Sequence, residues 1–83
     1  MLYEFKTKLT TAEITAKAKG FFGKAPGGLG LDLTVDDDCC LTFVGGGGRV
    51  SMSATAQGKE TVVSIETTEW DRQVKEFLKA HGK

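Results

Sequence analysis

The pattern of apolar and polar positions is clearest in the middle of the chain, where it alternates with period two in four short runs. The runs cover residues 29–35, 39–44, 49–56 and 60–67. Period two with one apolar side is typical of strands that bury one face of a sheet. The side chains expected on the buried face are Leu29, Leu31, Leu33, Val35, Cys39, Leu41, Phe43, Val50, Met52, Ala54, Ala56, Val63 and Ile65.

Turn-forming segments separate the runs. They are the three aspartates at 36–38, the four glycines at 45–48, and residues 57–59. Acidic residues are poor strand formers, and glycine adopts positive φ without steric cost. The aspartates lack the spacing of a calcium loop, and no helix follows the glycines as a phosphate-binding loop requires. We therefore interpret all three segments as turns of an antiparallel meander.

The N-terminal part predicts one more strand, followed by a helix. Residues 2–9 repeat the alternation and indicate a strand. Thr10 and Glu13 have the spacing of a capping box, in which each side chain bonds the backbone N–H of the other. We expect the helix to begin there and to end at about Gly20 or Phe22.

The C-terminal part predicts a second helix. Thr68 is in position to cap it, and the helix is expected to extend from Glu69 to about His81. Its apolar side chains fall on one face. We interpret Trp70 as the residue that anchors this helix against the sheet.

These elements give the order β-α-β-β-β-β-α and an α+β fold, in a single domain over residues 1–83. The strand–helix–strand start makes the first two strands parallel, so the meander brings the last strand antiparallel to the first. We predict a five-stranded antiparallel sheet of order 1-5-4-3-2 with both helices on one face. Residues 29–35 would then form an exposed edge.

This order of elements resembles one half of the TATA-binding protein and, more loosely, the helix-grip folds that hold apolar ligands. The resemblance covers the whole chain but carries over no functional residue. The TATA-binding protein works on the sheet face opposite its helices, with intercalating Phe side chains and basic residues. In this chain the charged residues expected on that face are Glu4, Lys6, Lys8, Asp32, Arg49, Glu60 and Glu66. Positive charge does not dominate, so DNA binding is not expected.

The charge balance supports the same conclusion for the whole chain. Eleven basic and eleven acidic side chains give a formal net charge of zero. Such a chain lacks the positive excess that neutralises phosphates or attracts an anionic membrane. No apolar run is long enough to span a bilayer, and no signal pattern precedes the first strand. We expect a cytoplasmic protein without a nucleic-acid or membrane partner.

The adjacent Cys39 and Cys40 are the residues that most invite a chemical role. Neighbours in a strand point to opposite faces, so we expect one buried and one exposed thiol in a reducing compartment. A vicinal disulfide or a shared metal ion is not expected. His81 is the only histidine and has no companion nucleophile or carboxylate pattern. The sequence thus predicts no catalytic residue, no metal site and no cofactor.

The most distinctive predicted surface is the hydroxyl-rich outer face of the sheet, formed by Thr34, Thr42, Ser51, Ser53, Thr55 and Ser64. Hydroxyl residues can simply be strand formers that face water. Alternatively they form a polar docking face, with Val44 and Val62 as possible further contacts. The residues selected as the candidate binding site are Arg49, Ser51, Ser53, Thr42 and Ser64.

Two functional hypotheses follow. The first is a non-enzymatic binding or assembly module that acts on an unknown protein partner or forms a homodimer, through the edge at residues 29–35 or the polar sheet face. The second is a carrier that holds a small apolar ligand between the helices and the sheet. The residues expected around such a ligand are Phe21, Phe22, Met52 and Phe77. An enzyme would need residues from a partner chain.

Overall fold

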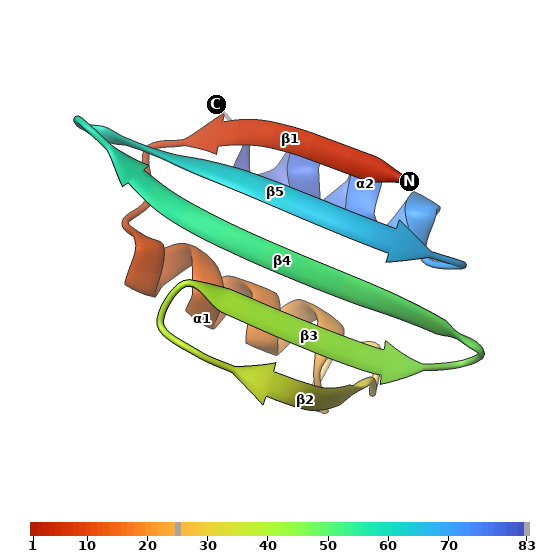
Figure 1. Ribbon diagram of the computed structural model, residues 1–83. Coiled ribbons are helices and arrows are strands. Elements are labelled where there is room, and N and C mark those ends of the chain that lie inside the picture. Colours follow the sequence, from red (N-terminus) through yellow and green to blue (C-terminus); the bar gives the residue numbers. More distant parts are fainter. Residues whose placement is uncertain (25, 83) are drawn as a thin grey trace.

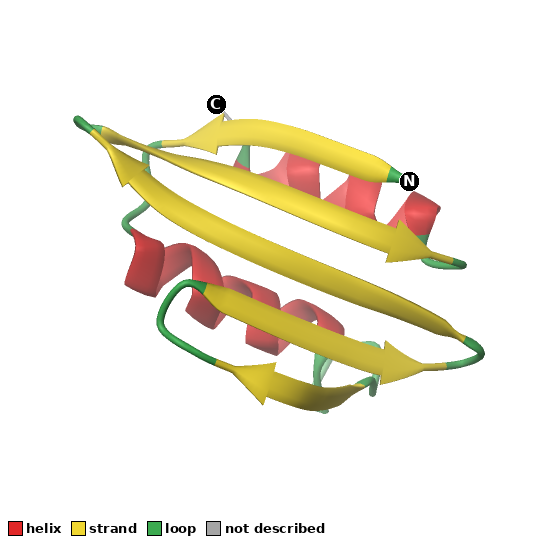
Figure 2. Ribbon diagram, in the orientation of Figure 1, coloured by secondary structure: helices red, strands yellow, loops and turns green. Residues whose placement is uncertain are grey.

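The predicted order of elements is confirmed in the computed structural model, which describes residues 1–24 and 26–82 (Figure 1). The elements are β1 (Leu2–Thr7), α1 (Thr11–Phe22), β2 (Asp32–Asp36), β3 (Cys40–Gly45), β4 (Gly48–Gln57), β5 (Glu60–Thr68) and α2 (Asp71–His81). The strands form one antiparallel sheet in the predicted order β1-β5-β4-β3-β2. Both helices lie on the same face of this sheet (Figure 2). No helix in the described ranges is long and apolar enough to cross a membrane.

The capping box predicted at the start of α1 is present. Glu13 N donates to Thr10 Oγ1 over 3.1 Å, and Thr10 N donates to Glu13 Oε1 over 2.9 Å. These bonds satisfy two of the backbone N–H groups that the first turn of a helix leaves without partners. The helix ends at Phe22, within the predicted range.

The core fills the layer between the sheet and the helices. Its buried side chains are Ile14, Ala18, Phe22, Leu31, Leu41, Phe43, Val50, Met52, Ala54, Val63, Ile65, Val74 and Phe77. The Phe22 ring connects the two helices and the sheet, because it lies 5.3 Å from the ring of Phe77 and 5.6 Å from that of Phe43. Burial of a side chain of this size contributes about 1.5–3 kcal/mol, so this cluster provides the main term that holds the layers together.

The expectation that Leu33 and Val35 are buried is wrong, since they are 38% and 40% exposed. The register shifts between them, so that Leu33 pairs with Phe43 while Val35 pairs with Thr42. This irregularity turns Val35 to the face without helices. Leu33 stays on the helix side, but it lies in the edge strand β2, which has a neighbouring strand on one side only.

The predicted strand at residues 29–35 also begins later than expected, at Asp32. The backbone N–H groups of Leu29 and Leu31 donate to the carbonyls of Phe21 and Phe22, at 2.9 Å each. These bonds tie the segment to the end of α1 and not to β3. Leu31 is nevertheless buried, as predicted, while Ala56 near the end of β4 is exposed and was expected in the core.

The start of α2 differs from the prediction. Thr68 does not cap the helix, because it is the last residue of β5 and pairs with Arg49. Glu69 has a φ of 72°, and the helix begins at Asp71 with Trp70 at the N-cap position. Trp70 does act as an anchor: its Nε1 donates to the carbonyl of Gly45 over 3.0 Å. It therefore holds α2 to the turn between β3 and β4.

Candidate functional site

The face of the sheet without helices, called the open face below, brings four of the predicted binding residues together. Thr42 of β3 lies opposite Ser51 of β4, and Ser53 of β4 lies opposite Ser64 of β5. Paired residues of antiparallel strands share a face, and their Cβ atoms are about 4.5–5.5 Å apart. The four hydroxyls therefore form a compact group across three neighbouring strands.

An open hollow of about 350 Å³ lies over this group. Its lining residues are Leu2, Cys40, Leu41, Thr42, Ser51, Met52, Ser53, Ser64 and Glu66. The four hydroxyl side chains are half-buried, although no helix covers them, because neighbouring strands surround them. A partner that fills this hollow would meet hydroxyls held on a rigid sheet.

The hydroxyls of the hollow differ in their hydrogen bonds. Thr42 Oγ1 and Ser51 Oγ are 3.4 Å apart, and Ser64 Oγ donates to Glu4 Oε2 over 3.1 Å. Ser53 Oγ has no hydrogen-bond partner within the part of the chain that the structure describes. A hydroxyl can donate one bond and accept others, so Ser53 can offer both kinds to a partner.

The fifth predicted residue, Arg49, lies beside the hollow and does not line it. Its Nη2 is 3.8 Å from Glu66 Oε1, and both side chains are more than half exposed. An exposed ion pair of this kind contributes little to stability, and salt screens it. The Arg49 guanidinium can therefore leave Glu66 and meet a partner at small cost.

Sequence reasoning missed part of the lining. Leu2 reaches the hollow because β1 pairs with β5 and places it opposite Glu66. Apolar surface also borders the hydroxyls on the other side, where Val35 and Val44 are each 40% exposed. The register irregularity in β2 explains why the side chain of Val35 lies on the open face. The open face thus combines a hydroxyl centre with apolar and charged borders.

Cys39 and Cys40 form a disulfide, so the expectation of two free thiols is wrong. The expectation assumed that both residues lie in a strand. Cys39 instead lies in the turn, β3 begins at Cys40, and Asp37 and Cys40 exchange backbone hydrogen bonds of 2.9 and 3.3 Å. The alternation rule therefore does not apply between them. Cys40 places one end of the disulfide at the margin of the hollow.

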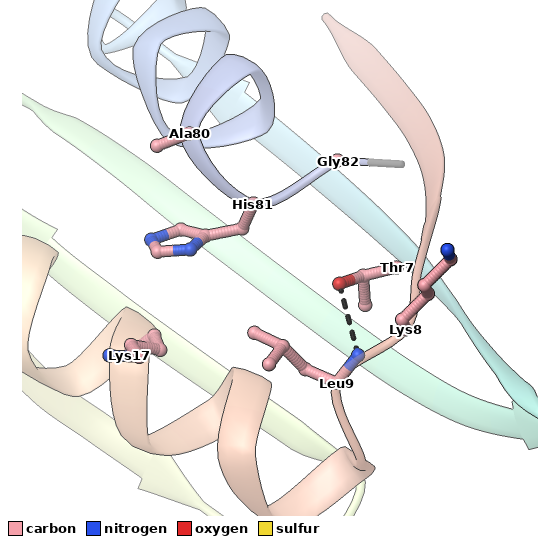
Figure 3. A pocket seen from close by; sticks show the side chains of 7 residues that line it. All are labelled: Thr7, Lys8, Leu9, Lys17, Ala80, His81 and Gly82. Atoms are coloured by element: carbon pink, nitrogen blue, oxygen red, sulfur yellow. Dashed lines mark hydrogen bonds between the residues drawn. The ribbon is translucent and has the colours of Figure 1, made fainter.

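A second hollow, of about 480 Å³, lies between the ends of β1 and α2 and the side of α1 (Figure 3). Its lining residues are Thr7, Lys8, Leu9, Lys17, Ala80, His81 and Gly82. Burial, and secondarily the charge of Lys17, lowers the pKa of His81 below its usual 6.5. Among the residues that the structure describes, no carboxylate or thiol lines this hollow, and the two lysine side chains extend from opposite sides without converging.

The three consecutive aspartates lie at the end of β2 and in the turn that follows it, and two of them make contacts within the fold. Asp36 Oδ1 accepts from Lys19 Nζ over 2.9 Å, which ties the end of β2 to α1. Asp37 joins the turn through the backbone bonds with Cys40, and its side chain and that of Asp38 are exposed. The predicted turn therefore begins at Asp37, one residue later than expected, because Asp36 still pairs with Leu41.

Comparison with protein-family models, with curated proteins and with solved structures finds no match to this chain. The predictions that the structure confirms are therefore the α+β order of elements and the sheet topology, without a family assignment. Any function must be argued from the residues of the chain itself. The open face is the candidate site that these residues support best.

Proposed function

We propose that this chain is a small non-enzymatic binding module whose open face docks a protein partner. The supporting observation is the convergence of four hydroxyls from three strands on one hollow, with Ser53 Oγ available for a new bond. Protein interfaces combine an apolar part with hydrogen-bonding groups, which the exposed Val35 and Val44 beside the hydroxyls provide. The resemblance to the TATA-binding protein favours the same face, though not its nucleic-acid ligand.

The partner we expect presents a flat surface with amide or hydroxyl groups. Short hydroxyl side chains on a sheet cannot reach far, so the partner must approach them closely. The nearby charges are mixed, since Arg49 stands beside Glu66 and Glu4 bonds Ser64. A strongly acidic or strongly basic surface would therefore meet repulsion on one side of the hollow. A near-neutral polar surface would not.

A comparison of two arginine variants tests this proposal. Ser53→Arg places a long charged side chain in the hollow, whereas Ala16→Arg makes a similar change on the exposed side of α1. Tagged wild-type and variant chains are isolated from the same cells, and bound proteins are quantified by mass spectrometry. We expect a partner that the wild type and Ala16→Arg retain equally and that Ser53→Arg retains at least about tenfold less. Equal retention by all three chains would contradict the proposal.

The alternative, a carrier of an apolar ligand, has less support. The residues expected around such a ligand pack against one another: the Phe22 ring lies 4.9 Å from that of Phe21 and 5.3 Å from that of Phe77. Phe22, Met52 and Phe77 are buried by the chain alone. These contacts favour a filled core. A native mass spectrum that shows excess mass, lost on denaturation, would support the carrier.

A further inference from the structure

The two edges of the sheet differ in their ability to accept another strand. The β2 edge is short and irregular, and Asp36, Asp37 and Asp38 follow one another at its end. Irregular register and clustered charge are features that protect an edge from pairing. The β1 edge has regular register along all six residues. These features favour β1 as the edge that pairs with another strand, and not the segment at residues 29–35, where we expected the pairing edge from the sequence.

The hydrogen bonds between β1 and β5 show which backbone groups lie at the free edge. Met1 and Thr67 exchange both backbone bonds, which makes them a hydrogen-bonded pair. Such pairs alternate along an antiparallel ladder, so every second residue of β1 points its N–H and C=O away from β5. The residues with outward backbone groups are Leu2, Glu4 and Lys6. A second strand can bond to these groups without disturbing the existing sheet.

We infer that β1 pairs antiparallel with β1 of a second copy of this chain, with Phe5 on the two-fold axis. In this register Glu4 lies opposite Lys6 of the second copy, and Lys6 lies opposite Glu4. Each of the two pairs makes two backbone hydrogen bonds, and all four side chains point to the open face. The pairing joins the two sheets into one.

The charges select this register over its neighbours. Moving the axis to Glu4 brings the two Glu4 side chains together, and moving it to Lys6 brings the two Lys6 side chains together. Like charges directly opposite are unfavourable. Lys6 is exposed and forms no ion pair among the described residues. Ser64 bonds Oε2 of Glu4, so Oε1 of that carboxylate can still accept from a lysine.

The helix side of the same edge carries the apolar side chains of Phe5 and Leu78, beside Lys79. A hollow of about 360 Å³ lies there, lined by Phe5, Lys6, Leu78, Lys79 and Gly82. Phe5 and Leu78 are only half-buried, and the Phe5 ring meets that of Phe77 at a centroid distance of 6.4 Å. With Phe5 on the axis, the two Phe5 rings face each other and cover this exposed apolar surface. The edge thus offers charge pairs on one side and aromatic contact on the other.

Charge reversal tests the pairing, with the oligomeric state measured by sedimentation over a range of concentrations. Glu4→Lys and Lys6→Glu each place like charges opposite one another twice, so each should raise the dimer Kd by at least about tenfold. The double variant Glu4→Lys/Lys6→Glu restores opposite charges and should return the Kd to within about threefold of the wild type. Lys75→Glu and Glu76→Lys, which are exposed on α2, should leave it unchanged.

Two outcomes would overturn the inference. One is a wild-type chain that stays monomeric up to millimolar concentration. The other is a dimer that the single reversals do not weaken, since its interface must then lie elsewhere. Amide exchange gives a second measurement: the amides of Leu2, Glu4 and Lys6 should gain protection as the concentration rises. These results are independent of the proposed docking on the open face, which Ser53→Arg tests.

Discussion

The glycine turn between β3 and β4 allows a sharp test of how α2 is anchored. A Cβ added at Gly48 would lie inside van der Waals distance of the Thr68 carbonyl oxygen, and would lie 2.6 Å from Glu69 Cβ and 3.0 Å from Trp70 Cδ1. Two of these three atoms belong to the backbone or to a Cβ and cannot rotate away. The side chain added by Gly48→Ala must therefore displace the chain between β5 and α2.

The expected cost follows from comparison with crowded cores. Overpacking typically costs about 1–3 kcal/mol, and the rigid neighbours place Gly48→Ala in the upper half of that range. A domain of this size has a stability of about 5–15 kcal/mol, so the loss is a large share. With a urea dependence of about 1–3 kcal/mol/M, the urea concentration at the unfolding midpoint should fall by roughly 0.7–3 M.

Two other glycines provide matched controls. Gly47 has a φ of 81° and nothing within 4 Å of an added Cβ, so Gly47→Ala should cost only the backbone strain of about 1–2 kcal/mol. Gly20 lies on the exposed side of α1 with nothing within 4 Å, and Gly20→Ala should stabilise by about 0.5–1 kcal/mol. Trp70 is the only tryptophan, so its fluorescence, with far-UV circular dichroism, reports unfolding. A Gly48→Ala chain as stable as the wild type would refute the placement of Trp70 and Glu69 against this turn.

Three further predictions concern the cap, the histidine and the cysteines. Thr10→Ala removes the α1 capping bond that Thr10 Oγ1 accepts from Glu13 N and should cost about 1 kcal/mol in urea denaturation, whereas Thr68→Ala, which removes no cap, should cost less than about 0.5 kcal/mol. Because the pKa of His81 is lowered in the folded chain, its contribution to stability is present above pH 6.5 and is lost as the pH falls through the folded pKa. Lys17→Ala should raise that pKa in an NMR titration but leave it below 6.5, since burial is the larger cause; a value at or above 6.5 would contradict this ranking. The disulfide predicts that the denatured chain reacts with a thiol reagent only after reduction, and prompt reaction of both cysteines would count against it.

The alternation of apolar and polar residues was sufficient to predict most of the fold. It worked for β3, β4 and β5, because their helix-facing residues, apart from Ala56, are mostly buried and their outer residues are mostly polar. It failed for β2, where Val35 continues the apolar period but faces the open side. The cause is a register shift against β3, which depends on the partner strand and is not visible in the β2 sequence.

The remaining errors arise from contacts between distant segments. Leu29 and Leu31 look like strand residues, but their N–H groups bond the last carbonyls of α1. Thr68 has the spacing of a cap, yet the pairing of β5 with β4 extends through it and leaves Trp70 to begin α2. Propensity alone cannot rank such competing interactions, because tertiary contacts override it.

The alternation of apolar and polar residues also predicted part of the candidate site. Thr42, Ser51, Ser53 and Ser64 fall at outward positions of strands whose order the sequence predicted correctly. Leu2 was missed although the order 1-5-4-3-2 already placed β1 beside β5. Its outward position in β1 was the available signal. Cys40 was assigned to the outer face, but its bond to Cys39 depends on where β3 begins.

Site-specific photo-crosslinking in cells tests the proposal that a protein partner docks on the open face. A photoreactive amino acid replaces Ser53 in the hollow in one variant and Ala16 on α1 in another. We predict a discrete crosslinked protein with the probe at position 53 that is absent with the probe at position 16. Crosslinking of the same proteins from both positions, or from neither, would contradict the claim.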